Sequence, residues 1–238
     1  MTFNSGDRVG ARTAIPQVGI DQGLRAYMLR VYNYMAGALA ITGVVAYFTA
    51  ASGLLAAIVG TPIYWIVVLA PLGFVLFLSF RIQNMSLGTA QATFWGYAAI
   101  MGLSMASLFL IYTGVSIAEV FFITAATFLS VSLYGYTTKR DLSGFGHFMF
   151  MGLIGIIIAS VVNFFLKSPA IYFAVSIIGV LVFTGLTAWD TQRIKEMYWA
   201  GDSDVIAGKK AIMGALALYL DFINLFVMMM QLMGNRRS

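Results

Sequence analysis

Charged residues are absent from three long stretches of this 238-residue chain. None occurs between Arg30 and Arg81, between Arg81 and Glu119, or between Asp141 and Lys167. An α-helix needs roughly 20 apolar residues to cross a bilayer, so each stretch has room for one or two spans. Only 10% of the residues are charged, whereas an average soluble domain carries about 25%. The sequence therefore predicts an all-α polytopic membrane protein and excludes a soluble enzyme or a nucleic-acid-binding domain.

Seven apolar runs are separated by short segments of Gly, Pro and polar residues. The runs cover residues 34–51, 63–80, 89–112, 120–138, 148–166, 170–189 and 211–233. Because the connections are short, consecutive helices are expected to be antiparallel neighbours. We expect a single seven-helix transmembrane domain over residues 27–238, preceded by a polar, cytoplasmic tail over residues 1–26. That tail has no apolar run of the kind that a signal peptide requires.

Lysine and arginine are unevenly divided between the two ends of these runs. If the N-terminus is inside, eleven basic residues face the cytoplasm: Arg8, Arg12, Arg25, Arg30, Arg81, Lys139, Arg140, Arg193, Lys195, Lys209 and Lys210. Three lie outside, namely Lys167, Arg236 and Arg237. This positive-inside bias predicts a cytoplasmic N-terminus and seven full spans, although the C-terminal arginine pair runs against it. Without a targeting segment, the expected location is a bacterial inner membrane.

Asp221 is the one charged residue that lies deep inside an apolar run. A carboxylate there costs about 2.5–3.5 kcal/mol on insertion scales, so it should face protein or water. Helical spacing places it on one stripe with small and polar residues: Gly214, Ala217, Asn224, Met228 and Gln231. The other side, with Leu220, Phe222, Ile223 and Phe226, suits lipid or packing. We therefore expect the last helix to lie near the centre of the bundle.

Asp221 needs a partner, and the best candidates are Asp190 and Arg81, each at the inner end of another span. When two carboxyl groups lie close together, ionising both costs free energy because the two negative charges repel each other. The pair would therefore share a proton. A nearby guanidinium would oppose this by favouring the charged forms. Counting along the helices places Asp221 deeper than Asp190, at about 16 Å from Lys210. The pair therefore meets only if the last helix starts outside the bilayer or the sixth sits deeper.

Structural roles are alternatives for each of these residues. Asp190 can pair with Arg193 one turn further on, as an ion pair at a helix end. Asp221 can serve as a hydrogen-bonding hub, and His147 as an interfacial residue at the start of the fifth span. Glu119, at the outer mouth, is expected to be solvated or to collect cations.

Two segments, at residues 186–195 (LTAWDTQRIK) and 217–226 (ALYLDFINLF), resemble the Bax inhibitor-1 family, the transmembrane Bax inhibitor motif proteins. The resemblance covers nearly the whole chain and includes the order of both motifs. Trp189 stands where the family usually has Tyr, which keeps an aromatic anchor. The loop at 201–204 (GDSD) is similar to the longer loop of some bacterial members.

The resemblance implies a seven-helix bundle with a central last helix and a pH-sensitive calcium leak. It implies that Asp190 and Asp221 form the paired aspartates of the pH sensor and gate, and that Arg81 is their arginine partner. Calcium is a hard cation that takes oxygen ligands, so the two aspartates suit a weak, transient calcium site, with Asn224 and Glu119 along the cation path. Calcium ions, protons and the bilayer are the expected partners, together with other membrane proteins. No cofactor and no nucleic acid are expected.

Other functions remain open at this point. A non-conducting regulator of membrane-protein quality control or cell survival would act through helix contacts. An intramembrane aspartyl protease also uses two aspartates on adjacent spans, but the Gly-x-Gly-Asp of those enzymes is replaced here by Leu218-Tyr219-Leu220-Asp221. A retinal protein would need a lysine inside the last span, which has none. The sequence thus favours a channel that is not an enzyme.

Overall fold

The computed structural model describes residues 17–237, and every regular element in that range is a helix. The elements are α1 (Gln17–Ala51), α2 (Leu54–Ile58), α3 (Pro62–Arg81), η1 (Ile82–Asn84), α4 (Leu87–Met105), α5 (Leu108–Ile111), α6 (Gly114–Thr137), α7 (Ser143–Leu166), α8 (Pro169–Glu196) and α9 (Asp204–Met233). The predicted all-α class is confirmed. Arg8 and Arg12, which carry part of the orientation argument, lie outside the described residues.

Seven of these segments are long and apolar enough to cross a membrane. They coincide with the seven apolar runs, but most of the helices extend beyond the apolar residues. α1 begins at Gln17, so the last ten residues of the predicted polar tail are helical. α8 continues to Glu196, past the end of its apolar run at residue 189, and α9 starts at Asp204, before its apolar run begins at residue 211. Polar residues at the end of a span can continue a helix into water. The cytoplasmic placement of the N-terminus stays a prediction.

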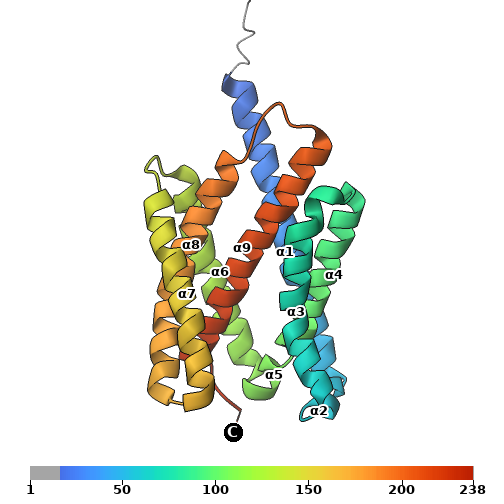
Figure 1. Ribbon diagram of the computed structural model, residues 1–238, viewed down its shortest axis with the longest axis vertical. Coiled ribbons are helices and arrows are strands. Elements are labelled where there is room, and N and C mark those ends of the chain that lie inside the picture. The colour runs from blue at the N-terminus through green and yellow to red at the C-terminus, as the bar shows by residue number, and fades with distance from the viewer. Residues whose placement is uncertain (1–16, 238) are drawn as a thin grey trace, which may run out of the picture.

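The helices form two groups with α9 between them (Figure 1). In one group α1 and α3 both pack against α4, and in the other α6 and α7 both pack against α8. α9 runs diagonally between the groups and packs against α1, α4, α6 and α8 (Figure 1). The first described turns of α1 and the C-terminus lie at opposite ends of the bundle.

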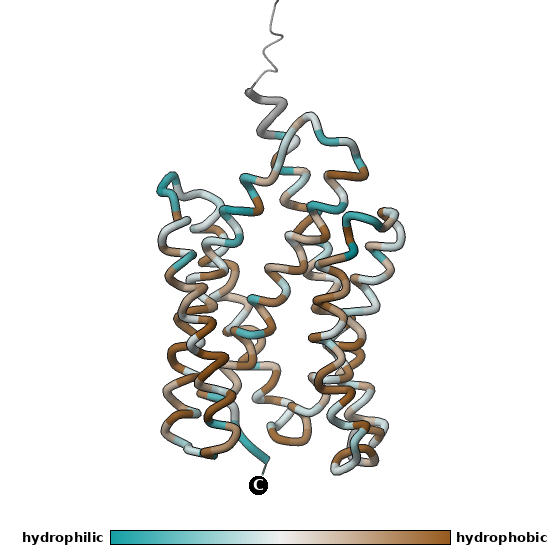
Figure 2. The backbone as a smooth tube through the Cα atoms, viewed as in Figure 1, coloured by the Kyte–Doolittle hydropathy of each residue, from teal (hydrophilic) through white to brown (hydrophobic). Residues whose placement is uncertain are grey.

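Burial within the protein does not follow hydropathy. In α9, 67% of the most apolar window is buried, against 11% in α3 and 6% in α7, which are the two most hydropathic spans. Lipid is as apolar as these side chains, so an apolar surface gains little from facing protein instead. Hydrophilic residues gather at the end that carries the 138–142 and 197–203 connections, here called the inner end (Figure 2).

Two glycines bring α8 close to its neighbours just before Asp190. A Cβ at Gly135 of α6 would collide with the backbone of Ala188, and one at Gly146 of α7 would collide with the ring of Trp189. Small residues allow such close helix crossings in membranes. The segment that precedes Asp190 is therefore packed closely against α6 and α7. This packing fixes the direction in which the Asp190 side chain points, toward α9.

Candidate functional site

Asp190 of α8 and Asp221 of α9 lie side by side and are both buried, at 8% and 5% exposure. Their side chains are within hydrogen-bonding reach of each other. An ionised carboxylate only accepts hydrogen bonds, so a bond between the two requires a proton on one of them. The structure therefore brings together the two aspartates that the sequence singled out, in a geometry that allows them to share a proton.

Arg193 is the arginine beside this pair. Its Nη2 atom lies 2.8 Å from Oδ1 of Asp190, one helical turn away, and its guanidinium stacks over the Trp189 ring at 4.8 Å. The contact with Asp190 is close, but it is not aligned as a hydrogen bond, so Oδ1 of Asp190 is left without a hydrogen-bond partner. Oδ2 of Asp221 also has no hydrogen-bond partner. Buried oxygens of this kind retain the capacity to bind a proton or a cation.

The carboxyl pair faces a cavity of about 830 Å³ that lies between α3, α7, α8 and α9. Asp190, Asp221, Arg193 and Asn224 line it, together with apolar residues of α3 and α7. The amide nitrogen of Asn224 donates to the carbonyl oxygen of Leu220 at 2.8 Å, which leaves the amide oxygen free to accept. The cavity thus combines carboxylate and amide oxygens with one guanidinium inside largely apolar walls, to which His147 and Ser160 of α7 add polar groups.

The polar stripe predicted on the last helix divides between two environments. Its middle, from Ala217 to Met228, lines the cavity. At its ends, Gly214 packs against Ile194 of α8, and Gln231 accepts a hydrogen bond from the Ser176 hydroxyl at 2.7 Å. Because the cavity separates part of α9 from α3 and α7, the central position of the last helix stays a prediction.

The predicted opposite side of α9 needs one correction. It does not concern Phe222, Ile223 and Phe226, which are buried at 2–7% exposure, so that the packing role allowed for them is confirmed. Leu220, which was placed with them, lines the same cavity as Asp221. Residues one apart on a helix differ by about 100°, so Leu220 flanks the stripe and does not oppose it.

Arg81 does not lie at the carboxyl pair. It is exposed at the last turn of α3, and among the described residues the ion pairs are Arg193–Asp190 and Lys210–Asp202. α3 packs chiefly against α4. A contact between Arg81 and the aspartates would need α3 to move toward α9, so its role as their partner stays a prediction.

His147 and Glu119 also have defined positions. His147 is exposed at the start of α7 but lines the cavity, where its ring lies 5.8 Å from that of Trp189. Its Nδ1 atom is 2.6 Å from the carbonyl oxygen of Ser143. Glu119 is exposed near the outer end of α6 and does not line the cavity. Of the two residues proposed for the cation path, only Asn224 is near the aspartates.

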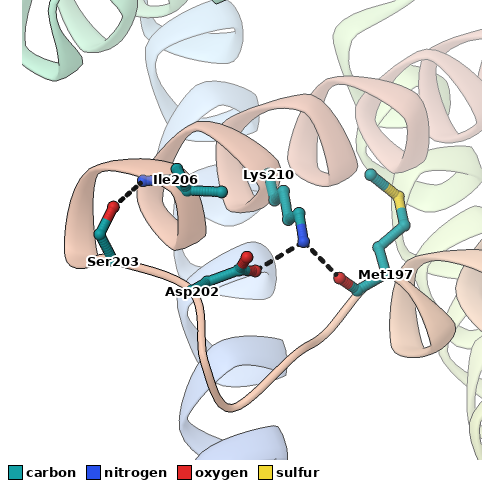
Figure 3. A network of polar contacts seen from close by, with 5 residues as sticks. All are labelled: Met197, Asp202, Ser203, Ile206 and Lys210. Carbon is teal, nitrogen blue, oxygen red and sulfur yellow. Dashed lines mark hydrogen bonds and ion pairs between the residues drawn. The ribbon is translucent and has the colours of Figure 1, made fainter.

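The connection between α8 and α9 explains how the two aspartates come level. The Lys210 ammonium donates to Oδ2 of Asp202 at 2.6 Å and to the carbonyl oxygen of Met197 at 3.0 Å (Figure 3). Ser203 caps the start of α9 by accepting from the Ile206 amide (Figure 3). α9 therefore starts past the inner ends of α3 and α4 (Figure 1), which lets Asp221 reach the level of Asp190.

Sequence reasoning missed the polar side chains that hold α8 in place behind the site. The hydroxyl of Thr191 lies 2.9 Å from that of Ser132, which lies 2.6 Å from that of Tyr32. Gln192 accepts from the Leu142 amide and donates to the Arg140 carbonyl oxygen, both at 2.8 Å. Uncharged polar residues inside spans are the signal that a search for charges alone passes over.

This fold and site define a seven-helix membrane protein with a buried acidic pair on its last two spans. The family model described as "Inhibitor of apoptosis-promoting Bax1" matches residues 24–238. The chain therefore belongs to the Bax inhibitor-1 family. Curated relatives span nearly its whole length. An uncharacterised protein of Rickettsia prowazekii is 52% identical, over 92% of this chain and 93% of its own.

Two further relatives are less similar in sequence. The inner membrane protein YbhL of Escherichia coli is 48% identical, over 90% of this chain and 94% of its own. An uncharacterised membrane protein of Streptococcus pyogenes is 33% identical, over 90% of this chain and 95% of its own. The name of the Escherichia coli relative places that protein in an inner membrane, which is the location expected for this chain.

Proposed function

We propose that this protein is a pH-sensitive calcium leak channel of a bacterial inner membrane, in which Asp190 and Asp221 form the sensor and gate. The observation that carries the proposal is the position of both carboxyl groups, within hydrogen-bonding reach of each other at the wall of a cavity of about 830 Å³. A buried carboxyl pair is a costly feature in a membrane span and is typical of ion and proton pathways.

The charge of the pair sets its affinity for cations. With one shared proton, the single remaining negative charge is balanced by Arg193, whose Nη2 lies 2.8 Å from Asp190. When that proton leaves, the two carboxylates repel each other and carry a net negative charge with Arg193. Proton uptake and release would then change both the contact between α8 and α9 and the attraction of a calcium ion.

The ligands present suit a transient calcium site. Calcium takes six to eight oxygen ligands in a tight site, whereas the cavity offers the two aspartates and the amide oxygen of Asn224. Within the described part of the chain, no group of three acidic, histidine or cysteine side chains gathers to hold a metal. A weak site lets an ion leave as readily as it enters, which conduction requires.

α3 is the element proposed to move. It packs chiefly against α4, and its Leu72 and Val75 line the cavity on the side opposite α9. A shift of α3 toward α9 would narrow the cavity and carry Arg81 toward the aspartates. In this proposal Arg193 holds Asp190 in the arrangement described here, and Arg81 competes for the carboxylates when α3 closes.

The test is calcium entry into liposomes that contain the purified protein, measured with a trapped fluorescent indicator across a range of pH. We expect flux that varies with pH, and we expect Asp190→Asn with Asp221→Asn to remove that variation. Asp141→Asn, in an exposed connection, is the matched control and should keep it. No flux in the wild-type protein, or unchanged pH dependence in the double variant, would overturn the proposal.

The arginines are separated by single variants in the same assay. Arg193→Gln should move the pH of half-maximal flux upward, since it removes the positive charge that favours the ionised Asp190. Arg81→Ala should change the pH response only if α3 closes onto the pair. An unchanged response in Arg81→Ala would remove Arg81 from the gate and leave Arg193 as the arginine of the site.

A second candidate is a non-conducting regulator of membrane-protein quality control or cell survival. The description of the matching family as an inhibitor favours this regulatory function. Absence of calcium flux at every pH, from protein that is folded in the liposomes, would favour this function. Peptide cleavage that is lost in Asp221→Asn, with no effect on flux, would instead favour an intramembrane protease.

A further inference from the structure

A second groove lies apart from the aspartate cavity and shares no lining residue with it. It runs between α1 and α6, has a volume of about 400 Å³, and opens toward the membrane past Leu29, Leu129 and Leu133, all of which are exposed. Its floor includes Tyr32 and Ser132. These surfaces belong to spans that the proposed channel mechanism does not use.

The polar groups on the floor of this groove are already paired. The Tyr32 hydroxyl lies 2.6 Å from that of Ser132, which in turn lies 2.9 Å from the hydroxyl of Thr191. Paired hydroxyls need no further hydrogen bonds from a ligand. The body of the groove therefore suits an apolar occupant, and hydrocarbon is the apolar material that surrounds it in a bilayer.

The inner end of the groove is basic. Arg25 of α1 lines it and is exposed. The Lys195 ammonium donates to the carbonyl oxygen of the lining residue Tyr136 at 2.8 Å and lies 5.8 Å from the centre of its ring. An ammonium has three donors, so two remain for a ligand. Arg25 lies about two helical turns inward of Tyr32, and Tyr136 about one turn inward of Ser132.

We propose that this groove binds one anionic phospholipid of the inner leaflet, with its phosphate at Arg25 and Lys195 and an acyl chain along Leu29, Leu129 and Leu133. An apolar groove that has paired polar groups at its floor and Arg25 in its lining, with the Lys195 ammonium at the carbonyl oxygen of the lining residue Tyr136, is complementary to such an amphiphile. Basic pockets between transmembrane helices on the cytoplasmic side are where anionic headgroups bind. A zwitterionic headgroup carries its own ammonium and gains less from two cations.

The groove is linked to α8 through the hydroxyl of Thr191, which contacts that of Ser132 on the groove floor. Thr191, which closes the chain of hydroxyls at the floor, directly follows Asp190 along α8. The two residues lie about 100° apart on the helix, with Thr191 directed toward Ser132 of α6 and Asp190 toward the cavity. Occupancy of the groove thus bears on the helix that carries the gate, although lipid binding does not depend on calcium conduction.

Native mass spectrometry of the purified protein tests the site, with phosphatidylglycerol and phosphatidylethanolamine of matched acyl chains as probes. We expect phosphatidylglycerol to be retained preferentially. Arg25→Gln and Lys195→Gln should each weaken its binding roughly fivefold, in line with about 1 kcal/mol for each basic residue near an anionic surface. Lys167→Gln, at the opposite end of the bundle, is the matched control and should leave binding unchanged.

A second variant tests the groove without altering charge. Leu129→Trp fills it from its exposed rim and should reduce binding of phosphatidylglycerol even with both cations present. Excess inorganic phosphate should not displace the lipid, because the acyl chain contributes to binding. Equal retention of the two lipids, unchanged binding in the charge variants and in Leu129→Trp, or displacement by phosphate alone would each overturn the proposal.

Discussion

α3 and α9 are both apolar enough to span a membrane, yet they have opposite surroundings. α3 has the higher mean hydropathy, 2.3 against 1.9. Only 11% of its most apolar stretch is buried inside the protein, against 67% in α9. α3 packs chiefly against α4, whereas α9 packs against α1, α4, α6 and α8. In a bilayer the more apolar helix is therefore the peripheral one, because small and polar residues are what hold helices together there.

The two helices also differ in how their surroundings constrain movement. α9 is held by hydrogen bonds to several elements, such as that between the hydroxyls of Tyr219 and Thr42, 2.6 Å apart. α3 has apolar contacts, and just past its inner end the Lys209 ammonium donates to the carbonyl oxygen of Gln83 in η1. A helix with few specific contacts can shift at low cost, which is why the proposed mechanism assigns the movement to α3.

The largest effect is expected at a close helix crossing in the interior. Gly135→Ala places a Cβ against the backbone of Ala188, and backbone cannot give way as a flexible side chain can. We expect it to lower the free energy of unfolding by about 2–3 kcal/mol, as for overpacked cores. SDS-induced unfolding in detergent micelles measures the change.

Gly73→Ala is the matched control on α3, because a Cβ there meets nothing within 4 Å. It should leave stability unchanged or raise it by about 0.5–1 kcal/mol through the better helix propensity of alanine. Equal destabilisation by the two variants would mean that α3 is packed as tightly as the interior, contrary to the contrast drawn above.

The next effect concerns the attachment of a peripheral helix to the interior. Gln192→Ala removes both hydrogen bonds that tie the start of α7 to α8, at the Arg140 carbonyl oxygen and the Leu142 amide. We expect a loss of about 1–3 kcal/mol, since the amide of the buried Leu142 is left unpaired. Hydrogen exchange should rise in residues 138–146 and stay unchanged in α9.

Gln83→Ala serves as the comparison for this variant. Gln83 is exposed and contacts Lys209 through its backbone carbonyl oxygen, which the substitution keeps. Exchange in residues 138–146 should therefore match the wild type. If Gln192→Ala leaves exchange there unchanged, α7 is held by its glycine contacts alone.

The sequence was sufficient to predict the helices and the acidic pair, and it offered the Asp190–Arg193 ion pair as an alternative, but it did not decide between Arg193 and Arg81 as the arginine of the site. Charge-free stretches define spans because the cost of a charge in hydrocarbon is large, and Asp221 was found as the exception to them. The partner arginine was harder, because Arg81 and Arg193 both end a span on the inner side. Which of them is near depends on how α3 and α8 pack, and this is set by glycine crossings that leave no periodic signal.

A smaller effect is expected from a single hydrogen bond inside the bundle. Thr42→Val leaves the buried Tyr219 hydroxyl without its partner, and double-mutant cycles on such bonds in a membrane protein indicate a loss of about 0.6 kcal/mol. Thr127→Val is the control, because the Thr127 hydroxyl bonds only to Ile123 of its own helix. SDS unfolding of the two variants should separate them; an equal loss would show that α9 gains nothing specific from this bond.

The smallest effect is expected at an exposed carboxylate just before α7. Hydrogen bonds from the hydroxyl and the amide of Ser143 lower the pKa of Asp141 below its ordinary value of 3.8; the amide lies 2.8 Å from Oδ1. Because this pKa is lower in the folded protein, the stabilisation is present above 3.8 and is lost as the pH falls through the folded value. The Ser143 amide chemical shift should titrate in the wild type and not in Asp141→Asn. A midpoint at or above 3.8 would mean that these bonds do not favour the ionised form, and that the start of α7 is held by Gln192 alone.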